Sequence, residues 1–211
     1  MGRPAGPTRD TKALICERAL DVFAEKGYTA STMRDIARAA GMKDASLYNH
    51  FPSKHALFDA TVSWQLERLT TFLRSHHALA HPEDSTAAYA TDDPHQLLST
   101  VLASYEPFFS DPAIVKLRHI LEAERHADAR IAQVYRTVFI ARPIQLQRAI
   151  FTDLIASGHL EPCDTELAAR QFHGAVFLAL AEEMSWGDAQ RFIAKHLEAF
   201  QADHQTRKGR A

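Results

Sequence analysis

The chain has 211 residues, of which 46% are hydrophobic and 24% are charged, with only eight glycines and nine prolines. No stretch reaches the roughly 18 apolar residues of a membrane span, and the polar, Pro-rich segment Met1–Asp10 lacks the apolar core of a signal peptide. Cys16 and Cys163 stand alone, outside any CxxC or Cys/His cluster, which predicts two buried thiols in a reducing compartment. We therefore expect a cytoplasmic protein.

The charges are distributed unevenly along the chain. Residues 1–54 carry nine Lys and Arg against six Asp and Glu, whereas the remainder carries 15 against 20. The formal net charge of -2 alone argues against a nucleic-acid partner. A basic end joined to an acidic body is nevertheless the asymmetry expected when one end meets phosphate.

The first 76 residues predict four helices. Ile15, Ala19 and Phe23 follow helical spacing between Asp10 and Lys26. A second helix opens at Ser31 or Thr32, where Thr32 and Asp35 have the spacing of a capping box, and it ends at Gly41. A third, very short helix fits between Gly41 and Pro52, and a fourth runs from Pro52-Ser53 to about His76.

The third helix has a distinctive pattern. Asp44 is placed to cap its start, and Leu47 and Phe51, four residues apart, are predicted to face the core together. The outward side then carries small, hydroxyl, amide and aromatic groups: Ala45, Ser46, Tyr48, Asn49 and His50. A helix face exposed only to solvent is usually richer in Glu and Lys. Two short helices joined by a glycine turn, with this outer face, favour a helix-turn-helix that contacts DNA.

The polar segment from His81 to Pro94 is the clearest break, and the rest of the chain also predicts helices. The predicted helices are 95–110, 113–126, 128–157, 164–184 and 188–203. Pro143 falls inside the third of these and predicts a kink. The sequence thus predicts an all-α fold.

The segment SLYNHFPSKHALF resembles the LYxHFxSKxxL signature of the tetracycline-repressor-like (TetR) family. The positions that match the family pattern are Phe23, Gly27, Thr32, Ile36, Ala37, Ala40, Gly41, Leu47, Tyr48, Phe51, Lys54, Leu57 and Phe58. The match covers about residues 10–60. Beyond about residue 75 only the helical layout and the total length resemble the family.

The resemblance implies an N-terminal three-helix DNA-binding domain, 1–54. A long fourth helix joins it to a helical ligand-binding and dimerisation domain, 55–211. The last two helices of such a protein form a four-helix dimer interface. Its apolar positions here would be Leu167, Phe172, Val176, Leu180, Phe192, Leu197 and Phe200.

The resemblance also implies roles in DNA binding. Thr32, Tyr48, His50 and Lys54 should hold phosphates, whereas Ala45, Ser46 and Asn49 should face base edges. The full DNA-binding set expected is Thr32, Lys43, Ala45, Ser46, Tyr48, Asn49, His50 and Lys54. Asp44-Ala45 and His55 depart from the common pattern, which leaves the operator sequence open. Arg3 and Arg9 would either reach the DNA or belong to a solubilising tail.

The C-terminal helices are rich in aromatic residues, which suits a small hydrophobic or amphipathic effector as well as a plain core. The candidate ligand-binding residues are Phe108, Tyr135, Arg136, Phe139, Arg142, Phe172 and His173. Two groups of histidines, around His76 and around His119, could supply metal ligands, but their spacing matches no dedicated motif, so neither metal nor cofactor is expected.

The leading hypothesis is a homodimeric transcriptional repressor that a small-molecule effector releases from double-stranded operator DNA. An activator, or a regulator without a ligand, is the nearest alternative. A helical enzyme or scaffold with a vestigial DNA-binding end is the alternative from another class. The sequence has no GxSxG, HExxH or phosphate-binding glycine loop, so we do not expect an enzyme.

Overall fold

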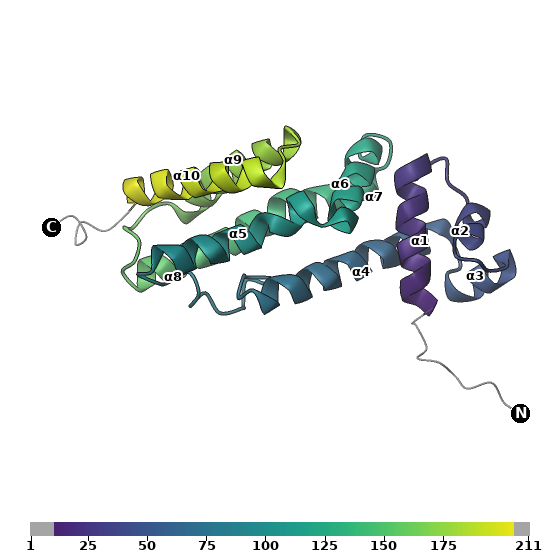
Figure 1. Ribbon diagram of the computed structural model, residues 1–211, viewed down its shortest axis with the longest axis horizontal. Coiled ribbons are helices and arrows are strands. Elements are labelled where there is room, and N and C mark those ends of the chain that lie inside the picture. The colour runs from purple at the N-terminus through teal and green to yellow at the C-terminus, as the bar shows by residue number, and fades with distance from the viewer. Residues whose placement is uncertain (1–10, 205–211) are drawn as a thin grey trace, which may run out of the picture. The chain divides into compact units, whose positions relative to one another are not determined.

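The computed structural model describes residues 11–204, and every regular element within that range is helical (Figure 1). This confirms the predicted all-α fold. The elements are α1 Thr11–Lys26, α2 Met33–Ala39, α3 Asp44–His50, α4 Lys54–Ser75, α5 Pro94–Ser110, α6 Pro112–Glu124, α7 Ala129–Arg136, the π-helical turn η1 Thr137–Ala141, α8 Arg142–Ala156, α9 Thr165–Ala181 and α10 Trp186–His204.

The described chain forms two compact units. The first runs to Arg68 and also includes Lys116–Ala132, and the second comprises Leu69–Val115 and the chain from Gln133 onward. The boundaries between the units therefore fall inside α4, α6 and α7. The division after residue 54 that the sequence suggested stays a prediction.

The first unit is built on helices α1 to α3 (Figure 1). Phe23 in α1 is fully buried and meets the ring of Phe58 edge-on at 5.6 Å between centroids. The predicted capping box of α2 is present, because the Thr32 hydroxyl accepts from the Asp35 backbone N–H and the Asp35 carboxylate accepts from the backbone N–H of Thr32. Local sequence rules thus account for the start of α2.

The start of α3 differs from the prediction. The N-cap residue is Lys43, its side chain makes no capping bond, and Asp44 is the first helical residue. Instead of capping, the Asp44 carboxylate pairs with the guanidinium of Arg34 at 3.2 Å. The capping role predicted for Asp44 is wrong, since an ion pair with α2 takes its carboxylate.

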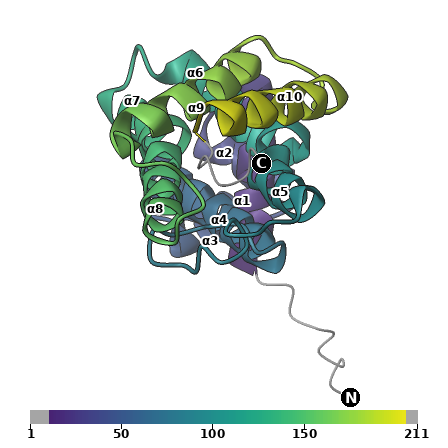
Figure 2. The same cartoon turned by 90° about the vertical axis from the view of Figure 1, so that its left-hand side faces the viewer.

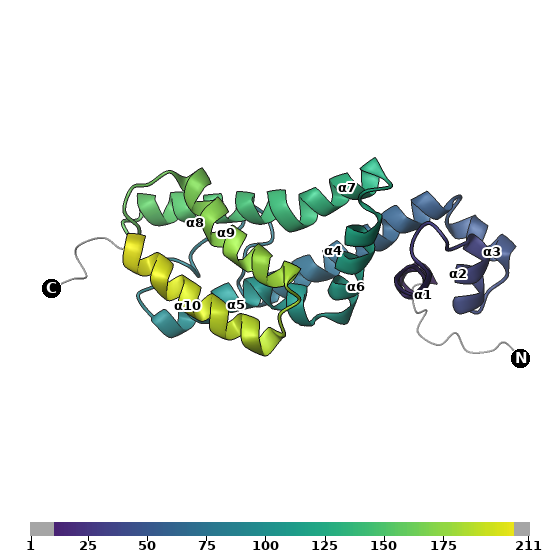
Figure 3. The same cartoon turned by 90° about the horizontal axis from the view of Figure 1, so that it is seen from above.

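The second unit is formed by α5, α8, α9 and α10. Helix α9 packs against α8, and α10 packs against both α5 and α9 (Figures 2 and 3). Its core includes Tyr105, Ile150, Phe151, Ala169, Phe172, Val176, Ile193, Leu197 and Phe200. Cys16 is buried as predicted, whereas Cys163 is only half-buried.

Five of the seven residues predicted to form the dimer interface lie in the core of their own chain. Phe172, Val176, Leu180, Leu197 and Phe200 are all buried within the chain. Helical periodicity marks an apolar face but does not show which helix covers it. The expectation is therefore corrected for these five residues, and a dimer formed through α9 and α10 stays a prediction.

The helix type changes locally next to Pro143, where the sequence predicted a kink. Pro143 has no N–H and cannot donate to the carbonyl of Phe139, four residues earlier. The chain passes through the π-helical turn η1 directly before α8, and Pro143 lies in the first turn of α8. The Phe139 carbonyl instead accepts from His173 Nε2 at 2.8 Å.

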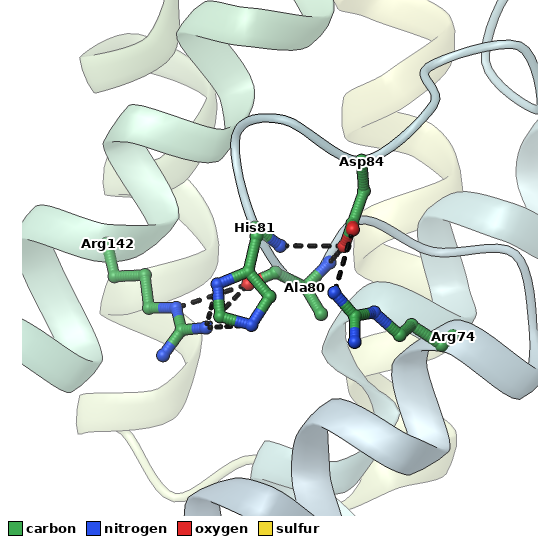
Figure 4. A network of polar contacts seen from close by, with 5 residues as sticks. All are labelled: Arg74, Ala80, His81, Asp84 and Arg142. Carbon is green, nitrogen blue, oxygen red and sulfur yellow. Dashed lines mark hydrogen bonds and ion pairs between the residues drawn. The ribbon is translucent and has the colours of Figure 1, made fainter.

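The connection between α4 and α5 is held by two arginines (Figure 4). Asp84 accepts from Arg74 at 2.9 Å and from the backbone N–H groups of Ala80 and His81 at 3.0 and 2.9 Å. Arg142 donates to the Ala80 carbonyl at 2.6 Å. The hydrogen bond from Arg74, together with the two backbone donors, lowers the pKa of Asp84 to about 2.

This low pKa has a consequence for stability. A carboxyl whose pKa is lower in the folded than in the unfolded chain stabilises the fold above its unfolded pKa of about 4, and this contribution is lost as the pH falls toward 2. We expect Asp84→Asn to lower the unfolding temperature at pH 7, and the difference from the parent protein to shrink between about pH 4 and pH 2.

Thermal unfolding at a series of pH values measures this difference. Asp92→Asn is the matched control, because Asp92 is an exposed carboxylate of the same connection. A difference that stays constant down to pH 2 would contradict the role assigned to Asp84.

Candidate DNA interface

Helix α3 presents the outer face that the sequence predicted. Leu47 has no exposed surface and Phe51 is buried, which confirms the predicted inward direction. On the other side Ala45, Ser46 and Asn49 are exposed. Tyr48 is 52% exposed, which is unusual for a large aromatic side chain and leaves its hydroxyl and ring accessible to a partner.

Two further predicted residues flank this face. Lys43 is exposed directly before α3, where its ammonium is accessible. His50, the last residue of α3, is half-buried. The predicted contacts of Arg3 and Arg9 lie outside the described residues.

At the start of α2, the Asp35 carboxylate is held by an ion pair and by hydrogen bonds. The Asp35 carboxylate accepts from Lys26 at 2.7 Å and from the Thr32 hydroxyl at 2.7 Å. These contacts, with Lys26 contributing most, hold the pKa of Asp35 far below its usual value. The Thr32 hydroxyl therefore makes its hydrogen bonds within the first unit, to Asp35. Its predicted phosphate contact stays a prediction.

Lys54 is enclosed by backbone carbonyls. Its ammonium donates to the carbonyls of Tyr28, Thr29 and Ser31 at 2.8, 3.1 and 2.9 Å, and lies 4.6 Å from the centre of the Tyr28 ring. An ammonium has three donors, so all three are used. A cation at a helix N-terminus is disfavoured by the helix dipole, and the three carbonyls offset that cost. In this structure Lys54 fixes the α1–α2 connection to the start of α4.

The same connection is held from its other side by a residue far along the chain. Glu124, at the end of α6, accepts from the Thr29 backbone N–H at 3.1 Å and from the Thr29 hydroxyl at 2.7 Å. Gly27 has a φ of 78°, and a Cβ there would lie 3.2 Å from Glu124 Oε1. Glycine at this position therefore allows both the turn and the approach of Glu124.

Two ion pairs reinforce the attachment of this segment to the unit. Lys116 pairs with Asp21 of α1 at 2.7 Å, and Arg130 pairs with Asp59 of α4 at 2.8 Å. Sequence reasoning missed these contacts, because charged residues on an amphipathic helix look the same whether they face water or a partner. Only the repeated pairing of residues 116–130 with the DNA-binding helices identifies the segment as part of the first unit.

The residues predicted to bind a ligand are only partly brought together. Phe139 contacts the rings of Phe108 and Tyr135, at 5.9 and 5.4 Å between centroids, and its carbonyl accepts from His173. The other three make contacts outside this group. The Phe172 ring packs against the rings of Phe151 and Phe200. Arg136 donates a hydrogen bond to Gln133, and Arg142 donates to the Ala80 carbonyl.

The comparisons with known proteins agree with this arrangement. The family model for bacterial regulatory proteins of the tetR family matches residues 15–61, and that for the C-terminal domain of AefR-like transcriptional repressors matches residues 96–200. The chain belongs to the TetR family. The first match contains all of α2 and α3, and the second spans from α5 to α10.

Individual relatives are more distant. The transcriptional repressor KstR2 of Mycobacterium tuberculosis is 33% identical over 124 residues, which cover 50% of this chain and 62% of KstR2. The aligned part thus spans less than two thirds of that relative. The structure of KstR2, a ketosteroid transcriptional regulator, aligns with a TM-score of 0.58 over 97% of this chain and 100% of that one, at 23% identity.

Another solved structure has the same fold. A crystallised protein described as a TetR-family regulator from Mesorhizobium loti aligns with a TM-score of 0.75 over 96% of this chain and 100% of that chain, at 19% identity. None of the helices within residues 11–204 has the length and hydrophobicity of a membrane span, and the same residues contain no group of three or more His, Cys, Asp or Glu placed to hold a metal ion.

Replacement of Lys54 tests its role in the first unit. Lys54→Met keeps the apolar stem and removes three charge-assisted hydrogen bonds, so we expect the free energy of unfolding to fall by roughly 1–2 kcal/mol. Urea denaturation measures it. Lys43→Met, which removes an exposed cation of the same unit, should change stability by less than about 0.5 kcal/mol. Equal effects of the two substitutions would show that Lys54 does not hold the connection.

Proposed function

We propose that the protein is a DNA-binding transcriptional repressor that a small molecule releases from its operator. The observation that carries the proposal is α3, whose exposed polar face lies opposite the buried Leu47 and Phe51, within the segment that matches the TetR family. KstR2, the relative described above, is itself named a transcriptional repressor. A gel-shift experiment with DNA from around the protein's own gene tests the proposal.

The exposed face of α3 would enter the major groove. Asn49 and Ser46 would read base edges, because an amide both donates and accepts and so suits adenine. Ala45 would permit close approach. Tyr48, His50 and Lys43 would hold the phosphates beside it, together with Thr32 at the start of α2. Lys54 would act on phosphate only if its ammonium left a backbone carbonyl.

The protein would act as a homodimer, so that two α3 helices meet successive major grooves. Leu167 and Leu178 of α9 are the support for this, since they are 54% and 58% exposed. With Gln171 and Gly174, which are also exposed, they form one stripe along α9. A Cβ at Gly174 would meet nothing within 4 Å, so a second helix has room to approach.

The effector would bind in the second unit, where Phe108, Tyr135 and Phe139 form an aromatic cluster. KstR2 is titled a ketosteroid regulator, and FrrA, a structural neighbour at 24% identity with a TM-score of 0.65 over 93% of this chain and 98% of that one, is titled flavonoid-responsive. These descriptions agree with a small ring-containing effector for this protein. Effector binding would favour a dimer whose α3 helices no longer match the groove spacing.

Asn49→Ala separates base recognition from general affinity. The substitution should cost about 1–3 kcal/mol on the cognate site and relax the preference at one base pair, because one bidentate contact is lost. Binding titrations across single-base operator variants measure both effects. Lys195→Ala removes an exposed cation of α10 and should change neither. A uniform loss on all duplexes would mean that Asn49 does not read a base.

Leu178→Asp tests the proposed dimer face. A buried carboxylate opposite its own symmetry mate is strongly unfavourable, so the variant should sediment as a monomer at micromolar concentration where the parent protein is a dimer. Because Leu178 is exposed within the chain, helical content should be unchanged. An unaltered dimer would place the interface on another surface.

A further inference from the structure

The second unit contains two buried polar atoms that make no hydrogen bond with the rest of the described chain. Within the part of the chain that the structure describes, His173 Nδ1 and Gln147 Oε1 are buried and have no hydrogen-bond partner. Their residues are only 4% and 7% exposed. Leaving such an atom unpaired costs free energy, so each such atom in a native protein calls for an explanation.

The chemical form of His173 follows from the backbone. The ring must donate through Nε2, because the atom opposite it, 2.8 Å away, is the carbonyl of Phe139, which can only accept. This carbonyl is open to a side chain because Pro143 has no N–H to offer it. Burial lowers the pKa of His173, so the ring is neutral and its remaining nitrogen, Nδ1, is an acceptor.

Gln147 is in the same situation. Its side-chain amide bonds the Tyr105 hydroxyl of α5. With the amide in this orientation the oxygen is unpaired, and with the amide turned over the nitrogen would be unpaired instead, so one polar atom stays available in either case. Burial raises the pKa of Tyr105, which keeps its hydroxyl protonated.

The two atoms lie along one continuous stretch of helix made of α7, η1 and α8. Gln147 comes four residues, about one turn, after Pro143 in α8, and His173 of α9 bonds the carbonyl of Phe139, four residues before Pro143. The π-helical turn η1 contains Phe139, and turns of this kind recur at functional sites in helices. Aromatic rings lie next to both contact points, since Phe139 contacts Phe108 and His173 contacts Phe177.

The buried interior of the second unit contains no charged side chain among the described residues. Among the described residues of the second unit the buried polar side chains are Thr100, Gln147 and His173, none of which carries a charge. The partly buried Arg142 is committed to the Ala80 carbonyl. An anionic ligand would therefore lose its hydration without gaining a cation, which is strongly unfavourable.

We infer that His173 and Gln147 form the polar contacts of an effector site for an uncharged, ring-containing molecule with two hydroxyl groups, one of which donates to His173 Nδ1 while the other bonds the free atom of the Gln147 amide. The inference rests on the proposed function and specifies the ligand class of that site. The rings would pack against Phe139 and its aromatic neighbours, and the two hydroxyls would satisfy both buried polar atoms.

Three naphthalenes of one shape test the inference on the full-length protein by isothermal titration calorimetry. We expect 2,6-dihydroxynaphthalene to bind at least about fivefold more tightly than 2,6-dimethoxynaphthalene, which lacks donors, because each lost hydrogen bond costs roughly two- to tenfold in affinity. We expect no binding of naphthalene-2,6-dicarboxylate. Equal affinity for diol and diether, preference for the dianion, or no binding of any probe would overturn the inference.

Substitutions of His173 and Gln147 test whether these two side chains cause the preference for the diol. His173→Gln keeps a donor near the Phe139 carbonyl and removes the Nδ1 acceptor, and Gln147→Met removes the amide. Each should weaken the diol about fivefold, and His173→Gln should leave the diether unchanged. His196→Gln is the control, because His196 also bonds a carbonyl through Nε2, that of Phe172. Equal weakening of diol and diether by both variants would assign these residues to packing alone.

A parallel gel shift keeps this inference separate from the proposed function. If the diether or the dianion releases the protein from its operator, the regulator stands and the hydroxyl-bearing ligand class is wrong. If the diol is preferred but the protein recognises no DNA site, the ligand site stands and the regulatory function is wrong.

Discussion

The short connection between α1 and α2 is the point on which the DNA-binding unit depends. Its carbonyls receive the Lys54 ammonium from α4, and the Thr29 N–H and hydroxyl are held by the Glu124 carboxylate from α6. One connection of a few residues is thus fastened to two helices of distant origin. These charge-assisted bonds, which are stronger than bonds between neutral groups, hold the connection from which α2, and with it α3, continues.

This attachment gives a physical path by which helix movement reaches the recognition surface. A shift of α4 carries the Lys54 ammonium with it, and a shift of the end of α6 carries Glu124. Both act on the residues that lead directly into the capping box of α2, formed by Thr32 and Asp35. A regulator needs two arrangements of such a junction that differ by a few kcal/mol, and a hydrogen-bonded junction between helices can provide them.

The features that depend on spacing along the chain could be predicted, and those that depend on distant partners could not. The periodic apolar residues, the Thr32–Asp35 spacing and the inward pair Leu47 and Phe51 located α1 to α3 and the exposed face of α3. The sequence could not show that Lys54 bonds backbone carbonyls, because a lysine at a helix start occupies the same position in the sequence whether it contacts phosphate or a carbonyl. Pro143 predicted a disturbance but not its form, since the Phe139 carbonyl that Pro143 cannot bond is bonded by the His173 side chain from another helix.

The contacts made by residues 116–130 have a consequence for any measurement made at varying ionic strength. Lys116–Asp21 and Arg130–Asp59 are about half exposed on both sides and so lie within reach of screening by dissolved ions. Added salt would therefore act twice, on the phosphate contacts proposed for α3 and on the attachment of this segment to α1 and α4. The steepness of operator binding against salt would then report internal loosening together with counterion release. Phosphate contacts counted from that slope alone would exceed the number made, whereas differences between variants would cancel the shared part.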